Sequence, residues 1–124
     1  MAKKSPSKAI DVVALAKKYL RAKADACAEI ETREFWDEEE AHDDELVEET
    51  HRDFLAKMKA YQAQLAKEFG EPTETGEDEH DAIPRNGILE HAIWDVNGKS
   101  LFLAVSHEDT ELPCEILLGV TRGE

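Results

Sequence analysis

Residues 88–122, ILEHAIWDVNGKSLFLAVSHEDTELPCEILLGVTR, decide the fold. Two runs rich in β-branched and aromatic residues flank Asn97-Gly98, and this dipeptide is the strongest short signal for a tight hairpin turn. After a polar connection, residues 114–122 form a third run of the same kind. The stretch therefore predicts a three-stranded antiparallel β-meander.

The two-residue turn also fixes which side chains share a face of this meander. Trp94 lies on one face, which is expected to seat the helices, while Ile93 and Phe102 lie opposite each other on the second face. That second face also holds His91 and is too apolar for plain exposure to solvent. We expect a protein partner or a second copy of the chain to cover it, and cover by the preceding loop or by part of the first helix is the alternative.

The first half of the chain has the pattern of helices. Residues 7–69 contain no glycine and no proline and are dense in Ala, Lys, Glu and Leu. Apolar residues recur every three or four positions from Ile10 to Ile30 and again from Val47 to Phe69, where Gly70 ends the second stripe. The periodicity lapses between the stripes, so a turn is expected between residues 32 and 44.

Together these patterns predict an α+β fold in a single domain spanning residues 1–124. Two long antiparallel helices are expected over about residues 6–69, followed by an acidic loop over about 70–87 and a three-stranded antiparallel β-meander over about 88–122. A chain of this size buries enough surface for one core.

Negative charge is concentrated in two parts of the chain. The net charge is −14, from 29 acidic and 15 basic side chains. Residues 35–50 contain nine acidic and no basic side chains, and residues 70–85 contain six acidic side chains and one basic. Such clusters repel nucleic acid and anionic membranes and attract basic proteins, although they are also typical of solvated helix faces.

Trp36 lies at the edge of the first acidic run, either as a staple that closes the helical turn or as an exposed anchor for a partner. The acidic run and the apolar face of the meander together give the candidate partner-binding residues. They are Trp36, Glu38, Glu39, Asp43, Asp44, His91, Ile93 and Phe102.

Motifs for catalysis are missing from the sequence. There is no nucleotide-binding glycine loop, no Gly-x-Ser-x-Gly and no Cys-x-x-Cys. Glu39-x-x-His42 and Glu48-x-x-His51 match the ligand spacing of di-iron bundles, but they are nine residues apart and would lie on opposite sides of one helix. We therefore expect no catalytic residue, no cofactor and no metal.

Cys27 and Cys114 lie far apart in apolar surroundings, as is typical of reduced, buried thiols, and Cys114 reads as a small core residue. The sequence has no apolar run of membrane-spanning length and no signal-peptide pattern. These features favour a cytoplasmic protein.

The stretches Trp94–Gly98 (WDVNG) and His107–Pro113 (HEDTELP), together with the size and charge of the chain, resemble immunity proteins of bacterial polymorphic-toxin systems, whether contact-dependent or type VI secreted. The resemblance implies a protein that is not an enzyme and that neutralises a cognate, basic toxin or effector by protein contact. The alternative is a helical adaptor or structural protein that acts through homo- or hetero-oligomerisation, and a small enzyme or metal carrier is the third possibility.

Overall fold

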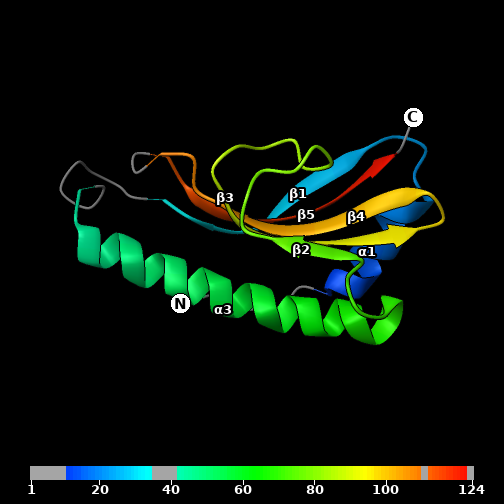
Figure 1. Ribbon diagram of the computed structural model, residues 1–124, viewed down its shortest axis with the longest axis horizontal. Coiled ribbons are helices and arrows are strands. Elements are labelled where there is room, and N and C mark those ends of the chain that lie inside the picture. The colour runs from blue at the N-terminus through cyan, green and yellow to red at the C-terminus, as the bar shows by residue number, and fades with distance from the viewer. Residues whose placement is uncertain (1–10, 35–41, 110–111, 123–124) are drawn as a thin grey trace, which may run out of the picture.

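Among the residues that the structure describes, five strands form one antiparallel sheet, and two helices pack on one of its faces (Figure 1). The computed structural model describes residues 11–34, 42–109 and 112–122. The sheet order is β1-β5-β4-β3-β2. The chain is α+β, but the expectation of two long helices followed by a three-stranded meander is wrong. Along the described chain the elements are α1 (Val12–Arg21), β1 (Ala26–Arg33), α3 (Asp44–Phe69), β2 (Glu74–Gly76), β3 (Ile88–Val96), β4 (Lys99–Ser106) and β5 (Cys114–Arg122).

The first helix is much shorter than its apolar stripe predicts. Helix α1 begins after Asp11, whose side chain accepts a hydrogen bond from the Ala14 N–H at 3.0 Å, and it ends at Arg21. Residues 26–33 then form β1, which pairs with β5 from Ala26↔Val120 to Arg33↔Cys114. Without β1, the apolar strand β5 would have an unpaired edge, and pairing that edge outweighs the weak strand preference of a run rich in Ala and Glu.

Helix α3 confirms the helix predicted from the second apolar stripe. It begins after Asp43, whose side chain accepts from the Leu46 N–H at 3.1 Å, and it ends before Gly70, whose φ of 86° suits a residue without a Cβ. Neither α1 nor α3 is both long enough and apolar enough to cross a bilayer. The buried side chains of α3 are those of Val47, Thr50, Phe54, Met58 and Leu65.

The predicted hairpin register is confirmed. Trp94 pairs with Leu101 and Ile93 pairs with Phe102 on either side of the Asn97-Gly98 turn. Trp94 is 2% exposed in the core between sheet and helices, and its indole N–H donates to the Gly70 carbonyl at 2.7 Å. This bond joins the end of α3 to the sheet.

The second face of the sheet is covered by the chain itself. Short strand β2, within the stretch expected to be only a loop, pairs with β3, and the segment that follows crosses this face (Figure 1). Ala82 and Ile83 of that segment pack in one cluster with Ile93 and Phe102. The covering segment is held at its end by Arg85, whose guanidinium forms an ion pair with Glu29 of β1 at 2.7 Å.

We expected a partner or a second copy of the chain to cover this face, and for these residues that expectation is wrong. His91 is 4% exposed, Ile93 is 5% exposed and Phe102 is fully buried. The alternative, cover by the acidic loop, is what the structure has. The ring of Phe102 lies against Gly119, where an added Cβ would come within 2.5 Å of the ring.

We predict that Phe102→Ala destabilises the isolated chain by about 3–5 kcal/mol, because the substitution leaves a cavity under residues 77–87. Urea unfolding followed by circular dichroism measures the change. Leu112→Ala is the matched control, since Leu112 is 47% exposed and its loss should have little effect on the free energy of unfolding. An unchanged stability of Phe102→Ala would place the ring on the surface and restore the partner-covered face.

Candidate functional site

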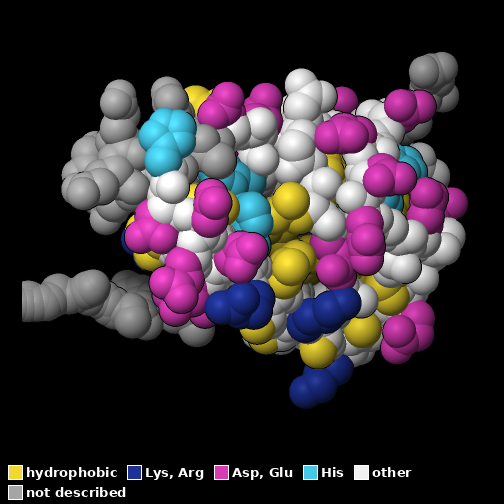
Figure 2. Space-filling view, turned by 60° about the vertical axis from the view of Figure 1, so that its left-hand side comes forward, with side chains coloured by type: hydrophobic (Ala, Val, Ile, Leu, Met, Phe, Trp, Pro, Cys, Tyr) yellow, Lys and Arg dark blue, Asp and Glu magenta, His cyan; other side chains and the backbone are white. Residues whose placement is uncertain are grey.

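The first three turns of α3 carry a dense set of exposed carboxylates. Residues 42–53 contain six acidic side chains and one basic side chain. We call the exposed residues Asp44, Glu45, Glu48 and Glu49 the acidic face. Figure 2 shows this end of the molecule, with acidic side chains gathered around histidines and a small apolar area.

The acidic face differs from the other half of α3 in how its charge is neutralised. In the described parts of the chain, none of its four carboxylates forms an ion pair. Further along the helix, Lys57 lies 3.5 Å from Glu31, and Lys59 lies 2.7 Å from Glu90. Charge that faces the sheet is therefore paired, whereas charge at the start of α3 is presented to solvent.

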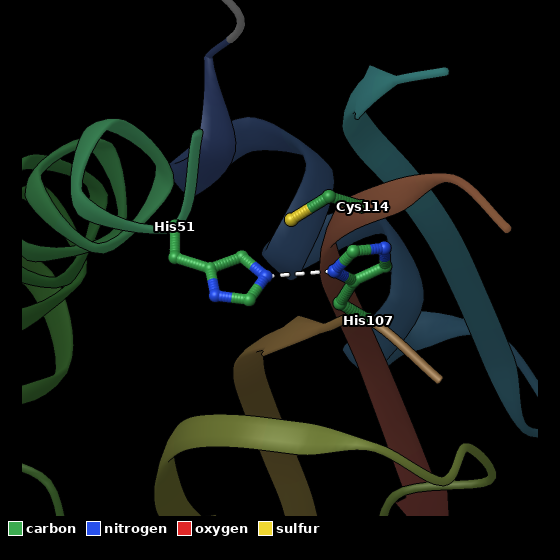
Figure 3. A group of neighbouring side chains, drawn as sticks. All are labelled: His51, His107 and Cys114. Atoms are coloured by element: carbon green, nitrogen blue, oxygen red, sulfur yellow. Dashed lines mark hydrogen bonds between the residues drawn. The ribbon is translucent and has the colours of Figure 1, made fainter. Parts of the chain in front are cut away.

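Beside the acidic face, three potential metal ligands come together from three elements (Figure 3). His51 projects from the second turn of α3, His107 follows the last residue of β4, and Cys114 is the first residue of β5. The Nε2 of His51 lies 2.7 Å from the Nδ1 of His107. The ligand atoms of all three side chains lie within 4.8 Å of one another.

Hydrogen bonding determines which ring nitrogens carry protons. The Nε2 of His107 lies 3.1 Å from the carbonyl oxygen of Leu112, and a carbonyl can only accept, so this nitrogen is the N–H donor. In a neutral ring the Nδ1 of His107 then carries a lone pair, and it accepts from the Nε2–H of His51. Both rings are neutral in this arrangement.

Burial agrees with neutral rings. It lowers the pKa of both His51 and His107, and this effect outweighs the nearby carboxylates of Glu48 and Asp109, which act in the opposite direction. Burial also raises the pKa of the Cys114 thiol to about 12. The cluster without a metal is therefore a neutral, hydrogen-bonded group between the helix and the sheet.

The candidate partner-binding residues from the sequence do not form one surface. Asp43 and Asp44 are exposed at the start of α3, as expected. His91, Ile93 and Phe102 lie under the segment of residues 77–87 and are not part of that surface. Trp36, Glu38 and Glu39 lie outside the described residues.

The cluster of His51, His107 and Cys114 was not predicted from the sequence, although the proximity of two of its members could have been. The pairing of β4 with β5 reaches Ser106↔Glu115, so one further step places His107 opposite Cys114 on the helix side of the sheet. The hairpin register and the strand that begins at Cys114 contain this signal. His51 could not be found in this way, because its approach depends on how α3 crosses the sheet.

Two open depressions also lie along α3. One, of about 290 Å³, is lined by polar side chains including the Lys59–Glu90 pair. The other, of about 280 Å³, lies beside the acidic face and is lined by Arg33, Glu49, Thr50, Asp53 and Phe54. Among the described residues, neither lining contains a serine, a cysteine or a histidine.

We predict that His51 and His107 are energetically coupled in the metal-free protein. A double-mutant cycle with His51→Gln and His107→Gln, measured by urea unfolding with a chelator present, should give a coupling of about 0.5–1.5 kcal/mol. The control cycle pairs His51→Gln with His80→Gln, a histidine that bonds to Glu74 and Ala82 instead, and should be additive. Additive effects of His51→Gln and His107→Gln would refute the hydrogen bond.

The chain matches no family model, no curated protein and no solved structure.

Proposed function

We propose that this chain is a small acidic binding protein of the cytoplasm that neutralises a basic toxin or effector domain by protein contact, in the manner of an immunity protein. In this proposal the protein acts without catalysis and without a cofactor. The observation that carries it is the exposed charge of Asp44, Glu45, Glu48 and Glu49 at one end of the molecule, which forms no ion pair within the described residues.

Helix stability explains only part of this charge. Asp44 and Glu45 lie in the first turn, where a carboxylate interacts favourably with the helix dipole. Glu48 and Glu49 follow them at a spacing of four residues, where like charges repel by a few tenths of a kcal/mol per pair. Since this repulsion opposes the gain in the first turn, helix stability does not account for the whole cluster, and a role in recognition is favoured.

The same charge indicates what kind of partner would bind. A carboxylate surface accelerates the encounter with a basic protein and repels nucleic acid and anionic lipid. Close packing against a few side chains then sets the lifetime of the complex. A basic protein domain is therefore the partner that fits this end best.

The alternative of a helical adaptor finds less support. Such a protein would present an apolar stripe to another helix. In the described residues, Leu112 is the large apolar side chain with substantial exposure, while the apolar stripe of α3 faces the chain's own sheet. Homodimerisation through a helix pair is not favoured for the same reason.

We predict that amide substitution of the acidic face, Asp44→Asn with Glu45→Gln, Glu48→Gln and Glu49→Gln, slows partner association by about tenfold or more at low salt and flattens its salt dependence. The partner is recovered by affinity capture from the native host, and stopped-flow mixing measures the rate at two ionic strengths.

The matched control removes the same charge elsewhere, by amide substitution of the exposed residues Glu71, Glu74, Glu77 and Asp78. This control should retain the parental rate, and unfolding curves should show that both variants are folded. Equal association rates for the parent and the acidic-face variant would mean that the acidic face is only a solvated surface. The proposal would then lose its support.

A further inference from the structure

We propose that His51, His107 and Cys114 form a binding site for a Zn²⁺ ion that joins the start of α3 to the connection between β4 and β5. The site lies beside the acidic face but is independent of the proposed function. Without the metal, His51 would be a histidine on a helix surface, His107 a histidine in a turn, and Cys114 a small core residue.

The donor set fits zinc. Two imidazole nitrogens and one thiolate are ligands that Zn²⁺ prefers, whereas Mg²⁺ and Ca²⁺ take oxygen ligands. Tetrahedral zinc with bonds of about 2.0–2.1 Å to nitrogen and about 2.3 Å to sulfur places two nitrogens about 3.3 Å apart, and a nitrogen and a sulfur about 3.6 Å apart. The three ligand atoms already lie within 4.8 Å of one another, so small rotations suffice.

The required movement is smallest for the two histidines. Their facing nitrogens are 2.7 Å apart and hold one proton between them. An ion in place of that proton would push the rings about 0.6 Å further apart, which side-chain rotation can supply. His51 would then carry its ring proton on Nδ1, leaving the Nε2 lone pair for the metal.

The second ring is already oriented as a ligand. His107 donates its Nε2–H to the Leu112 carbonyl, and its backbone N–H donates to the Gly87 carbonyl at 2.9 Å. Metal-binding histidines commonly donate their other ring N–H to a backbone carbonyl, because this bond fixes both the tautomer and the direction of the free lone pair. In this chain, that lone pair faces His51.

The thiol completes the set from the buried side. Cys114 is fully buried, and its sulfur points into the space between the two rings (Figure 3). Zinc would displace the thiol proton to solvent and bind the thiolate, which would offset one of the two positive charges of the ion. His51 is only partly buried, so the ion could enter from its side, where a water molecule can take the fourth position.

Zinc binding to the reduced, metal-free full-length chain tests the assignment. Competition with a chromophoric chelator should give one Zn²⁺ per chain, and Co²⁺ should give a thiolate charge-transfer absorption. His51→Gln and Cys114→Ser should each weaken Zn²⁺ binding by at least about tenfold, and Cys114→Ser should abolish the Co²⁺ absorption. Zinc should also raise the Tm of the parent by more than that of His51→Gln.

Two control variants keep the result specific to these residues. Cys27→Ser removes the other cysteine, which packs on the opposite face of the sheet, and His80→Gln removes a histidine outside the cluster. Both should retain parental affinity. If Cys114→Ser fails to fold, His51→Gln still decides the matter, because His51 is only partly buried on a helix.

Three results would overturn the assignment. They are the absence of stoichiometric Zn²⁺ binding, an affinity unchanged by His51→Gln, and a Co²⁺ absorption that disappears in Cys27→Ser instead of Cys114→Ser.

Discussion

Strand β5 is apolar on both of its faces, and the rest of the fold follows from covering both. Ile116, Leu118 and Val120 face the helices, while Leu117 faces the other side, where Gly119 admits the ring of Phe102. A strand of this kind needs a neighbour on each edge and a layer on each face. Strands β1 and β4 supply the edges, the two helices supply one layer, and the segment of residues 77–87 supplies the other.

Local patterns predicted the parts of the fold that depend on contacts near in sequence. The Asn97-Gly98 turn predicted the pairing of β3 with β4, and the stripe from Val47 to Phe69 predicted α3 to its last residue. Strand β1 could not be predicted in this way, because the spacing of Cys27 and Ile30 also fits a helix. Its conformation is decided by pairing with β5, some ninety residues later in the chain.

The residues of the acidic face and of the histidine–cysteine cluster also differ in how far the sequence predicts them. The acidity around Asp44 is plain in the sequence, and the register of β4 and β5 implies that His107 lies opposite Cys114. The contact with His51 is a property of packing alone, since α3 brings it there from more than fifty residues away. Because both apolar faces of the sheet are covered by the chain, recognition in our account depends on charge and not on an open hydrophobic surface.

Amide hydrogen exchange of the isolated chain tests this self-covered sheet most directly. In the folded structure the Ala82 N–H donates to the His80 ring at 3.0 Å, and the Ile83 N–H donates to the His80 carbonyl at 2.9 Å. We expect both amides to exchange far more slowly than amides in an unstructured chain. Exchange at unstructured rates, with β4 and β5 still protected, would mean that residues 77–87 leave the sheet open for a partner, and would contradict this expectation.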